Sequence, residues 1–460
     1  MRQFTSSDAA ALPFDTFLDV LPEDPSSDPA VVIRSLTDSA PPLTFQRLTR
    51  FLDEELDLGR SGLGHGDRLC VVVPNGPVSA VAFLALSQFT TYAPLNTGLT
   101  EAEFEFEFED LPAAAVAVLR GHHSPAAVAV ATRRGLPLLE IVPYDDVTGL
   151  FRLEWLRNAL PSLPVDTQQQ QQQQQQRRRR RRRARRDDIA LVLHTSGTTN
   201  KPKIVPLTHG NIVSGALMIA STMRLERRDL CLNIMPLFHI HGLVVNVLAS
   251  VVAGAGVVCT PGNLPPRVFL DRLASSPRPS WYSAVPTMHQ LILQHGEAMA
   301  QQAQQQQRQL LDHSLHTIRN CSAALLPAVS ERLERLFRGA TVLPTYAMTE
   351  SMPICSNPRP SRLSSSSSSS SSGGGLPPRR LRSVGPASGP AVRVLLNPPD
   401  DCRPCEPGEV RIRHSCCDEM SLSFIHSFIH SFIHSFILST LYYDEPTTVH
   451  FAHLRRGTSA

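Results

Sequence analysis

Short apolar strands alternate with helical segments along the first part of the chain, and this alternation constrains the fold more than any other feature. Residues 67–73 are typical of a buried strand, and residues 78–89 are typical of a helix. The same pair recurs as a strand at 92–95 and a helix at 100–111. Strands that are joined by helices usually pair in parallel, with helices on both faces of the sheet. We therefore predict an α/β fold built from doubly wound sheets.

The length of the chain, 460 residues, is too great for one small core and indicates two or more domains or subdomains. Changes in composition set the predicted boundaries. They give a polar N-terminal segment (1–40), a first α/β subdomain (41–167), a Gln/Arg insert (168–186), a second α/β subdomain (187–363), a Ser/Gly insert (364–375), the start of a small β subdomain (376–413) and an unassigned tail (414–460).

The Gln/Arg insert dominates the charge balance of the chain. The formal net charge is +3, but nine arginines lie at 177–183, 185 and 186, and without them 35 basic residues face 41 acidic ones, a net charge of −6. Such a tract cannot bury a core, and we interpret it as a solvated insert. The alternative is an arm that binds nucleic acid or anionic lipid electrostatically. The rest of the chain is mildly acidic and gives no indication of a nucleic-acid surface.

A polar loop follows the apolar strand predicted at 189–193 and is dense in hydroxyls and backbone N–H groups. Lys201 and Lys203 come at its end, and they are the only two lysines in the chain. Directed donors followed by lysine charge suit phosphate binding, although the spacing is not that of a Walker A loop. The alternative is a polar turn between a strand and a helix, with solvated lysines. The loop begins with Thr195, Ser196, Gly197, Thr198 and Thr199.

This loop resembles the phosphate loop TSGTTGxPK of the adenylate-forming (AMP-forming acyl-CoA synthetase) superfamily. The five residues from Thr195 to Thr199 match, as do Pro202 and Lys203. Asn200 stands where most members have glycine, and the oxalate–CoA ligase branch also carries another residue there. The resemblance implies that these matching loop residues hold the phosphates of ATP and that Lys203 has a catalytic role.

A second stretch, TYAMTE at 345–350, is similar to the YGMTE motif of the same family, with Ala347 in place of glycine. The resemblance implies that Tyr346 packs on adenine with Ala347 and Met348 beside the nucleotide. It also implies that Thr349 bonds the α-phosphate and that Glu350 holds Mg²⁺, for which a carboxylate is a suitable hard ligand. Taken alone, the same letters also suit the start of a helix with Thr349 as its cap.

Two further segments resemble the family's substrate-binding parts. In NIMPLFHIHGL at 233–243, the resemblance implies that His239 lines the acyl pocket. His239 and His241 are two residues apart, so a metal site is the alternative interpretation. In IRNCSAALLP at 318–327, the resemblance implies that the backbone of Ser322, Ala323 and Ala324 stacks against adenine.

Together these motifs imply an AMP-forming acid–CoA ligase. Such an enzyme activates a carboxylic acid with ATP and Mg²⁺ to an acyl-adenylate and passes the acyl group to CoA. The phrases PLFHIHGL, YSAVPTMHQ and CSAALLP favour the oxalate–CoA ligase branch, with medium-chain and aryl acid–CoA ligases as competitors. The motifs leave the acid and the oligomeric state open.

The resemblance runs from about residue 43 to residue 413 and then stops. The family's TGD motif, hinge and small C-terminal lid domain with its catalytic lysine have no counterpart after it, so we expect that lid to be absent and adenylation to be impaired. Arginine does not replace lysine in shape or hydration. The tail instead repeats SFIH at 423–438, either as an amphipathic helix or as non-coding or shifted-frame sequence. Four cysteines suggest a zinc site only weakly: Cys402, Cys405, Cys416 and Cys417.

Two other function classes stay open beside the ligase. One is a homologue that binds ATP or AMP without turnover, and the other is a nucleic-acid or anionic-surface protein that uses the arginine tract. Nine scattered cysteines without a secretory signal indicate a reducing compartment, and we expect the cytoplasm. No apolar run reaches the roughly 18–20 residues of a membrane helix. A Ser-Lys-Leu-type C-terminus, which would indicate peroxisomes, is missing.

Overall fold

The structure is a computed structural model, and it describes most of the chain up to residue 360 and two short strands after it. The described residues are 14–21, 31–36, 40–56, 58, 63–156, 184–195, 202–262, 264–305, 312–360, 384–385, 388, 393–397 and 409–413. The SFIH repeat, the four cysteines after residue 400 and the Ser/Gly insert lie outside these residues.

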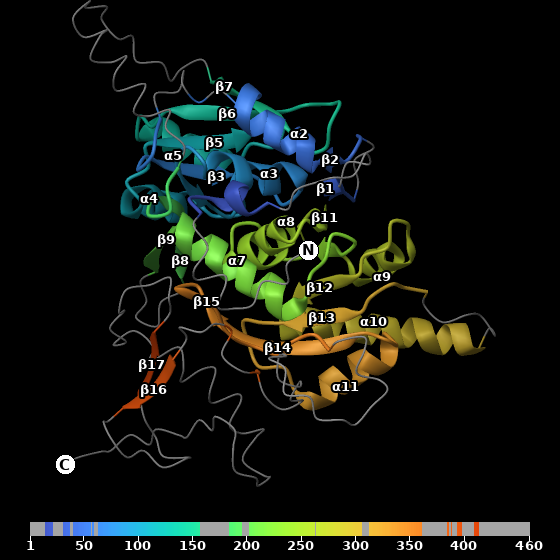
Figure 1. Cartoon of the computed structure of the whole chain (residues 1–460). Coiled ribbons are helices and arrows are strands. Elements are labelled where there is room, and N and C mark those ends of the chain that lie inside the picture. The colour runs from blue at the N-terminus through green and yellow to red at the C-terminus, as the bar shows by residue number, and fades with distance from the viewer. Residues whose placement is uncertain are drawn as a thin grey trace, which may run out of the picture.

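One seven-stranded sheet forms the upper part of the molecule in Figure 1. Its five inner strands are parallel, while β7 and β9 pair antiparallel at the two edges. Its order is β7 (Phe151–Trp155), β6 (Leu138–Pro143), β5 (Ala115–Leu119), β3 (Arg68–Val72), β4 (Thr91–Pro94), β8 (Ile189–Thr195) and β9 (Lys203–Thr208).

An eight-stranded sheet lies below it. The strands from β14 to β1 are parallel, and β15 and β2 pair antiparallel at the edges. The predicted α/β fold with doubly wound sheets is therefore confirmed. The order is β15 (Ser351–Ser356), β14 (Thr341–Met348), β13 (Thr317–Asn320), β12 (Trp281–Ala284), β10 (Leu230–Asn233), β11 (Gly256–Cys259), β1 (Val31–Ser35) and β2 (Leu43–Thr44).

Helices cover both faces of each sheet and make three apolar layers (Figure 1). The middle layer, between the sheets, holds α3 (Pro77–Leu86), α7 (His209–Met223), η3 (His241–Leu248) and α8 (Ala249–Val252). The layer outside the upper sheet holds α4 (Glu101–Asp110) and α5 (Pro125–Arg133). The layer outside the lower sheet holds α9 (Pro266–Ala274), α10 (Pro286–Gln305) and α11 (Pro327–Leu336). The remaining elements are η1 (Phe17–Val20), α2 (Phe45–Arg50), η2 (Phe51–Glu55) and the antiparallel pair β16 (Arg393–Asn397) and β17 (Glu409–Arg413). No helix of the described residues is long and apolar enough to cross a membrane.

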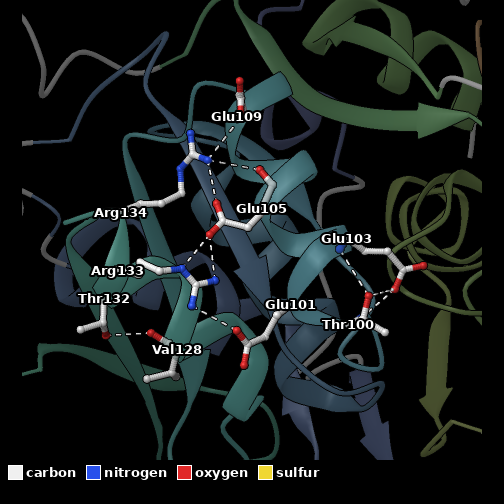
Figure 2. Close-up of polar contacts among 9 residues, drawn as sticks. All are labelled: Thr100, Glu101, Glu103, Glu105, Glu109, Val128, Thr132, Arg133 and Arg134. Atoms are coloured by element: carbon white, nitrogen blue, oxygen red, sulfur yellow. Dashed lines mark hydrogen bonds and ion pairs between the residues drawn. The ribbon is translucent and has the colours of Figure 1, made fainter.

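Helix α4 shows how local signals decide between helix and strand. Its letters EFEFEF alternate with the period of a strand, but Thr100 caps the helix and Glu103 completes a capping box. Phe104 and Phe108, four residues apart, are the pair that the helix buries. Figure 2 shows Arg133, the last residue of α5, and the next residue, Arg134, in contact with three glutamates of α4. These ion pairs are exposed, so solvent screens them and they add little to the stability of the fold.

Two parts of the chain join sheets across the predicted subdomain boundaries. Strand β1 comes from the predicted N-terminal segment and pairs with β11 in the lower sheet. The hairpin β8–β9 comes from the predicted second subdomain and completes the upper sheet. The last arginine of the Gln/Arg insert, Arg186, stacks over the Phe14 ring at 4.3 Å from its centroid. The end of the tract is therefore packed on the fold, while residues 168–183 lie outside the described part.

A buried carboxylate joins the amino ends of three parallel strands in the lower sheet. Asp229, just before β10, accepts from the hydroxyl of Ser280 before β12 and lies 2.7 Å from His316 Nε2 before β13. Arg359, after β15, contacts its other oxygen at 3.3 Å. Burial alone would raise the pKa of Asp229, but the His316 bond and charge outweigh it, so the pKa is lowered. The carboxylate is therefore ionised and fully engaged at neutral pH.

We expect Asp229→Asn to lower the free energy of unfolding at pH 7 by about 3 kcal/mol, because its buried partners would be left without the carboxylate that pairs with them. A lowered folded-state pKa stabilises the protein above the unfolded pKa of about 4, and this contribution is lost as the pH falls through the folded value. The deficit of the variant, measured by urea unfolding, should therefore persist down to about pH 4 and shrink between about pH 4 and about pH 2. An equal deficit at both pH values would assign the effect to packing.

Candidate active site

The parallel pairing of the lower sheet brings three predicted motif segments to one edge. Strands β14, β13, β12 and β10 are adjacent and parallel, so their carboxyl ends lie side by side. Thr349 and Glu350 follow β14, Ser322 follows β13, and His239 follows β10. In open α/β sheets, ligands bind outside the carboxyl ends of the strands. This edge is therefore the candidate site.

The predicted phosphate loop connects two antiparallel strands of the upper sheet. Thr195 ends β8 and pairs in register with Lys203, which begins β9. Both side chains are half-buried, and the loop residues between them, 196–201, lie outside the described part. That range includes Ser196, Gly197, Thr198 and Thr199. The alternative of a strand-to-helix turn is wrong, because the chain enters another strand before it reaches α7.

A histidine near the end of β8 contacts α4. His194 Nδ1 lies 2.5 Å from Glu107 Oε2, and Nε2 lies 2.8 Å from Asp110 Oδ2. Burial would lower the pKa of His194, but the two carboxylates outweigh it, and the pKa is raised. The ring thus joins the end of β8 to the outer helix α4.

Helix α7 connects the phosphate-loop hairpin to the second motif. Its N-terminus follows β9 and is capped by Thr208 in a capping box with Asn211. Farther along, α7 packs against β15, and a Cβ atom on Gly215 would lie 2.4 Å from the Met352 carbonyl oxygen. Only a residue without a side chain allows this approach. Strands β9 and β15 therefore both pack against one helix.

We expect Gly215→Ala to destabilise the protein by roughly 1–3 kcal/mol, because the added methyl would overlap rigid backbone. Gly98→Ala is the matched control, since its new Cβ would meet only the Asn96 side chain at 3.5 Å. Thermal unfolding of both variants checks this. A lower melting temperature for Gly215→Ala alone is expected, and equal shifts would contradict the close packing of α7 on β15.

The second motif forms the end of β14 and a tight turn. Tyr346 and Ala347 are buried, Met348 is half-buried, and Met348 pairs with Ser351 of β15. Thr349 and Glu350 are half-buried at the turn of this hairpin. The alternative of a helix start is therefore wrong. Burial raises the pKa of Tyr346 to about 12, so its phenol is neutral at physiological pH.

The segment after β13 presents backbone and one hydroxyl at the same edge. Ser322 and Ala323 are exposed, and Ala324 is half-buried. Ser322 has a left-handed backbone with φ of 71°, which is unfavourable for a residue with a side chain and is often found at functional sites. The Asn320 amide donates to the Ala323 carbonyl at 2.8 Å and holds this turn.

Two histidines after β10 differ in their surroundings. His241 is fully buried, with Nε2 2.6 Å from Ser283 Oγ and Nδ1 3.4 Å from Ser322 Oγ. Burial, then the charge of Arg319, lowers the pKa of His241 well below its usual value. His239 is exposed, yet burial also lowers its pKa, so its ring keeps a solvent-accessible face while protein surrounds the rest. The exposed face leaves the ring open to a ligand.

A hydrogen bond from the backbone of His241 to the ring of His239 determines which ring nitrogen of His239 carries the proton. The His241 N–H donates to His239 Nδ1 at 3.2 Å, so a neutral His239 carries its proton on Nε2. The metal interpretation finds no support here, because no group of three or more possible ligands occurs among the described residues.

Asn75 is a site residue that the sequence did not reveal. Its amide donates to the Met235 carbonyl at 3.2 Å, and its oxygen accepts from the Leu237 N–H at 2.8 Å. The turn after β3 in the upper sheet thereby fixes the segment that leads to His239. In the sequence Asn75 is an ordinary turn residue, because its partners are about 160 residues away.

Comparisons of the sequence with known proteins identify one family. The sequence matches the family described as AMP-binding enzyme over residues 57–417. It is 34% identical to a protein named "Probable CoA ligase CCL9" from Humulus lupulus, over 69% of this chain and 57% of that protein. It is 32% identical to an oxalate–CoA ligase from Arabidopsis thaliana, over 77% of this chain and 62% of that enzyme. The chain thus spans about three-fifths of the length of these curated relatives.

A solved structure shows the same fold. The crystal structure of ATP-bound MatB from Rhodopseudomonas palustris superposes with a TM-score of 0.61 at 21% identity, over 87% of this chain and 70% of that one. The family match covers more than three-quarters of the sequence, and the fold agrees with it. The chain belongs to the AMP-binding enzyme family.

Proposed function

We propose that this chain forms the nucleotide- and acid-binding part of an AMP-forming acid–CoA ligase. In the first step a carboxylate attacks the α-phosphate of ATP, which gives an acyl-adenylate and releases pyrophosphate. In the second step the CoA thiol takes the acyl group and releases AMP. The observation that supports this proposal is the convergence of the segments after β10, β13 and β14 at one sheet edge.

In this proposal the nucleotide lies across the edge with its phosphates toward the β8–β9 loop. Lys203 and the loop hydroxyls would hold the phosphates, and the hydroxyl of Thr349 would donate to the α-phosphate. Tyr346 would pack on the adenine from one strand, with Ala347 and Met348 beside it. The exposed backbone of Ser322, Ala323 and Ala324 would border the adenine from the next strand.

Glu350 is the residue that fits Mg²⁺. It is a half-buried carboxylate in the turn after β14, next to the proposed α-phosphate donor, and carboxylate oxygen is a preferred Mg²⁺ ligand. When bound, Mg²⁺ would neutralise phosphate charge. Lys203 and Thr349 would donate to the phosphates beside it.

We propose oxalate as the acid, with His239 as its contact. The similarity to a named oxalate–CoA ligase supports this choice. The neutral His239 ring, with its proton on Nε2, would donate a hydrogen bond to a carboxylate oxygen without adding a charge.

Calorimetry and pyrophosphate release test the proposal on the full chain. We expect heat of binding when ATP with Mg²⁺ is added, and pyrophosphate release that depends on oxalate. Heat without pyrophosphate release would indicate a homologue that binds nucleotide without turnover. Neither heat nor release, with oxalate or with short and aryl acids, would contradict the proposal.

The two lysines give a sharper test of the motif register. We expect Lys203→Ala to weaken ATP affinity about tenfold or more, because a cation near phosphates in a partly desolvated site interacts far more strongly than one in water. Lys201→Ala is the matched control and should change affinity little. Both variants should keep the stability of the wild type within about 0.5 kcal/mol.

Titration calorimetry with ATP and Mg²⁺ measures both variants. If Lys201→Ala proves damaging while Lys203→Ala has no effect, the register taken from the family is wrong. The assignments of the loop residues from Thr195 to Thr199 would then be wrong as well.

A further inference from the structure

Arg319 is a fully buried arginine on the lower sheet that has no acidic partner among the described residues. It is the third residue of β13 and is 0% exposed. Among the residues that the structure describes, none of its three guanidinium nitrogens meets a hydrogen-bond acceptor. Burial lowers its pKa, and the nearby Cys321 opposes this effect only in part. Buried charges are normally paired and hydrogen-bonded, so this one lacks its complement.

The surroundings of Arg319 add further donors and positive charge. In register it lies beside Ser283 of β12, which bonds His241. Trp281, two residues before Ser283, is on the same face of the sheet, and its buried indole N–H also has no acceptor among the described residues. The charged and titratable groups that act on His241 are all basic: Arg319, His239 and His289. Two orphan donors and three histidines thus converge with no carboxylate among them.

This basic cluster reaches from the protein surface to the interior. His239 and Ser322 are exposed, and Ser322 contacts the buried His241 at 3.4 Å. Arg319 is three residues from Ser322 along the same strand and turn. The buried Arg319 and the exposed Ser322 therefore belong to one short segment at this edge.

We infer that Arg319 determines substrate specificity by binding a second acidic group of the substrate, so that the preferred substrates are small diacids. This inference rests on the proposed ligase function and deepens it. A reacting carboxylate alone would not suffice as the partner of Arg319. Once it bonds to the α-phosphate its negative charge is lost, and the buried guanidinium would again be unpaired. A second carboxylate keeps its charge through adenylation and thioester formation.

The inference predicts that the chain binds a diacid more tightly than the monoamide of the same acid. Oxamate and malonamate have nearly the shape of oxalate and malonate but carry one negative charge instead of two. In calorimetry on the full chain with ATP and Mg²⁺ present, we expect the diacids to bind at least about tenfold more tightly than their monoamides, since charge-assisted pairs are the stronger ones. Equal binding of diacid and monoamide would overturn the inference.

Variants of Arg319 assign the preference to this side chain. Arg319→Met should abolish the preference for diacids over monoamides while ATP affinity is unchanged. Arg319→Lys, which keeps the charge, should retain part of this preference. Without ligand, Arg319→Met should be at least as stable as the wild type, because it removes an unpaired buried charge. A strongly destabilised Arg319→Met, or an Arg319→Lys that binds both classes equally, would show a structural role instead.

A fluorescence experiment places the bound acid. The chain has two tryptophans, Trp155 and Trp281, so Trp155→Phe leaves only the residue near Arg319 as a reporter. Oxalate should shift its emission, and oxamate should shift it much less. If ATP with Mg²⁺ does not bind the wild type, the proposed function fails. If ATP binds but oxalate causes no shift and no tighter binding than oxamate, this inference alone fails.

Discussion

The parallel pairing of β10, β12, β13 and β14 is the constraint on which the rest of the structure depends. Parallel strands end at the same edge, so motifs separated by more than a hundred residues lie within a few strand spacings of about 4.8 Å each. The second motif after β14, the turn at Ser322 and the segment to His239 owe their proximity to this pairing. Helix α7 then joins the edge to the phosphate-loop hairpin in the other sheet, through an approach that Gly215 permits.

The charged side chains at the two edges of the lower sheet differ in whether they are paired. At the amino edge, Asp229 is surrounded by His316, Ser280 and Arg359, and every charge is paired. Near the carboxyl edge, Arg319 and His241 are buried with no acidic partner in the described part of the chain. The first arrangement stabilises the folded chain in the absence of ligand. The second leaves free energy available for binding an anion, which is the usual distinction between a structural network and a site.

The features that could be predicted from the sequence are those that depend on local patterns of residues. The strand and helix alternation gave the fold class, and the Thr100 cap identified α4 despite its strand-like letters. Family motifs pointed to His239 as a site residue, and its role remains a proposal. Asn75 and Arg319 were missed, because a turn asparagine and an arginine between apolar residues acquire meaning only through partners on distant strands. The insertion of β1 into the lower sheet was missed for the same reason, since its partner β11 follows more than 200 residues later.

Hydrogen–deuterium exchange with and without ATP and Mg²⁺ tests the shared edge most directly. If one nucleotide binds across it, peptides covering 189–208, 317–326 and 343–352 should all gain protection together. Peptides from the outer helices α9 and α10 should not change. Protection confined to the arginine tract, or to one of the three segments alone, would contradict the account that these motifs form a single site.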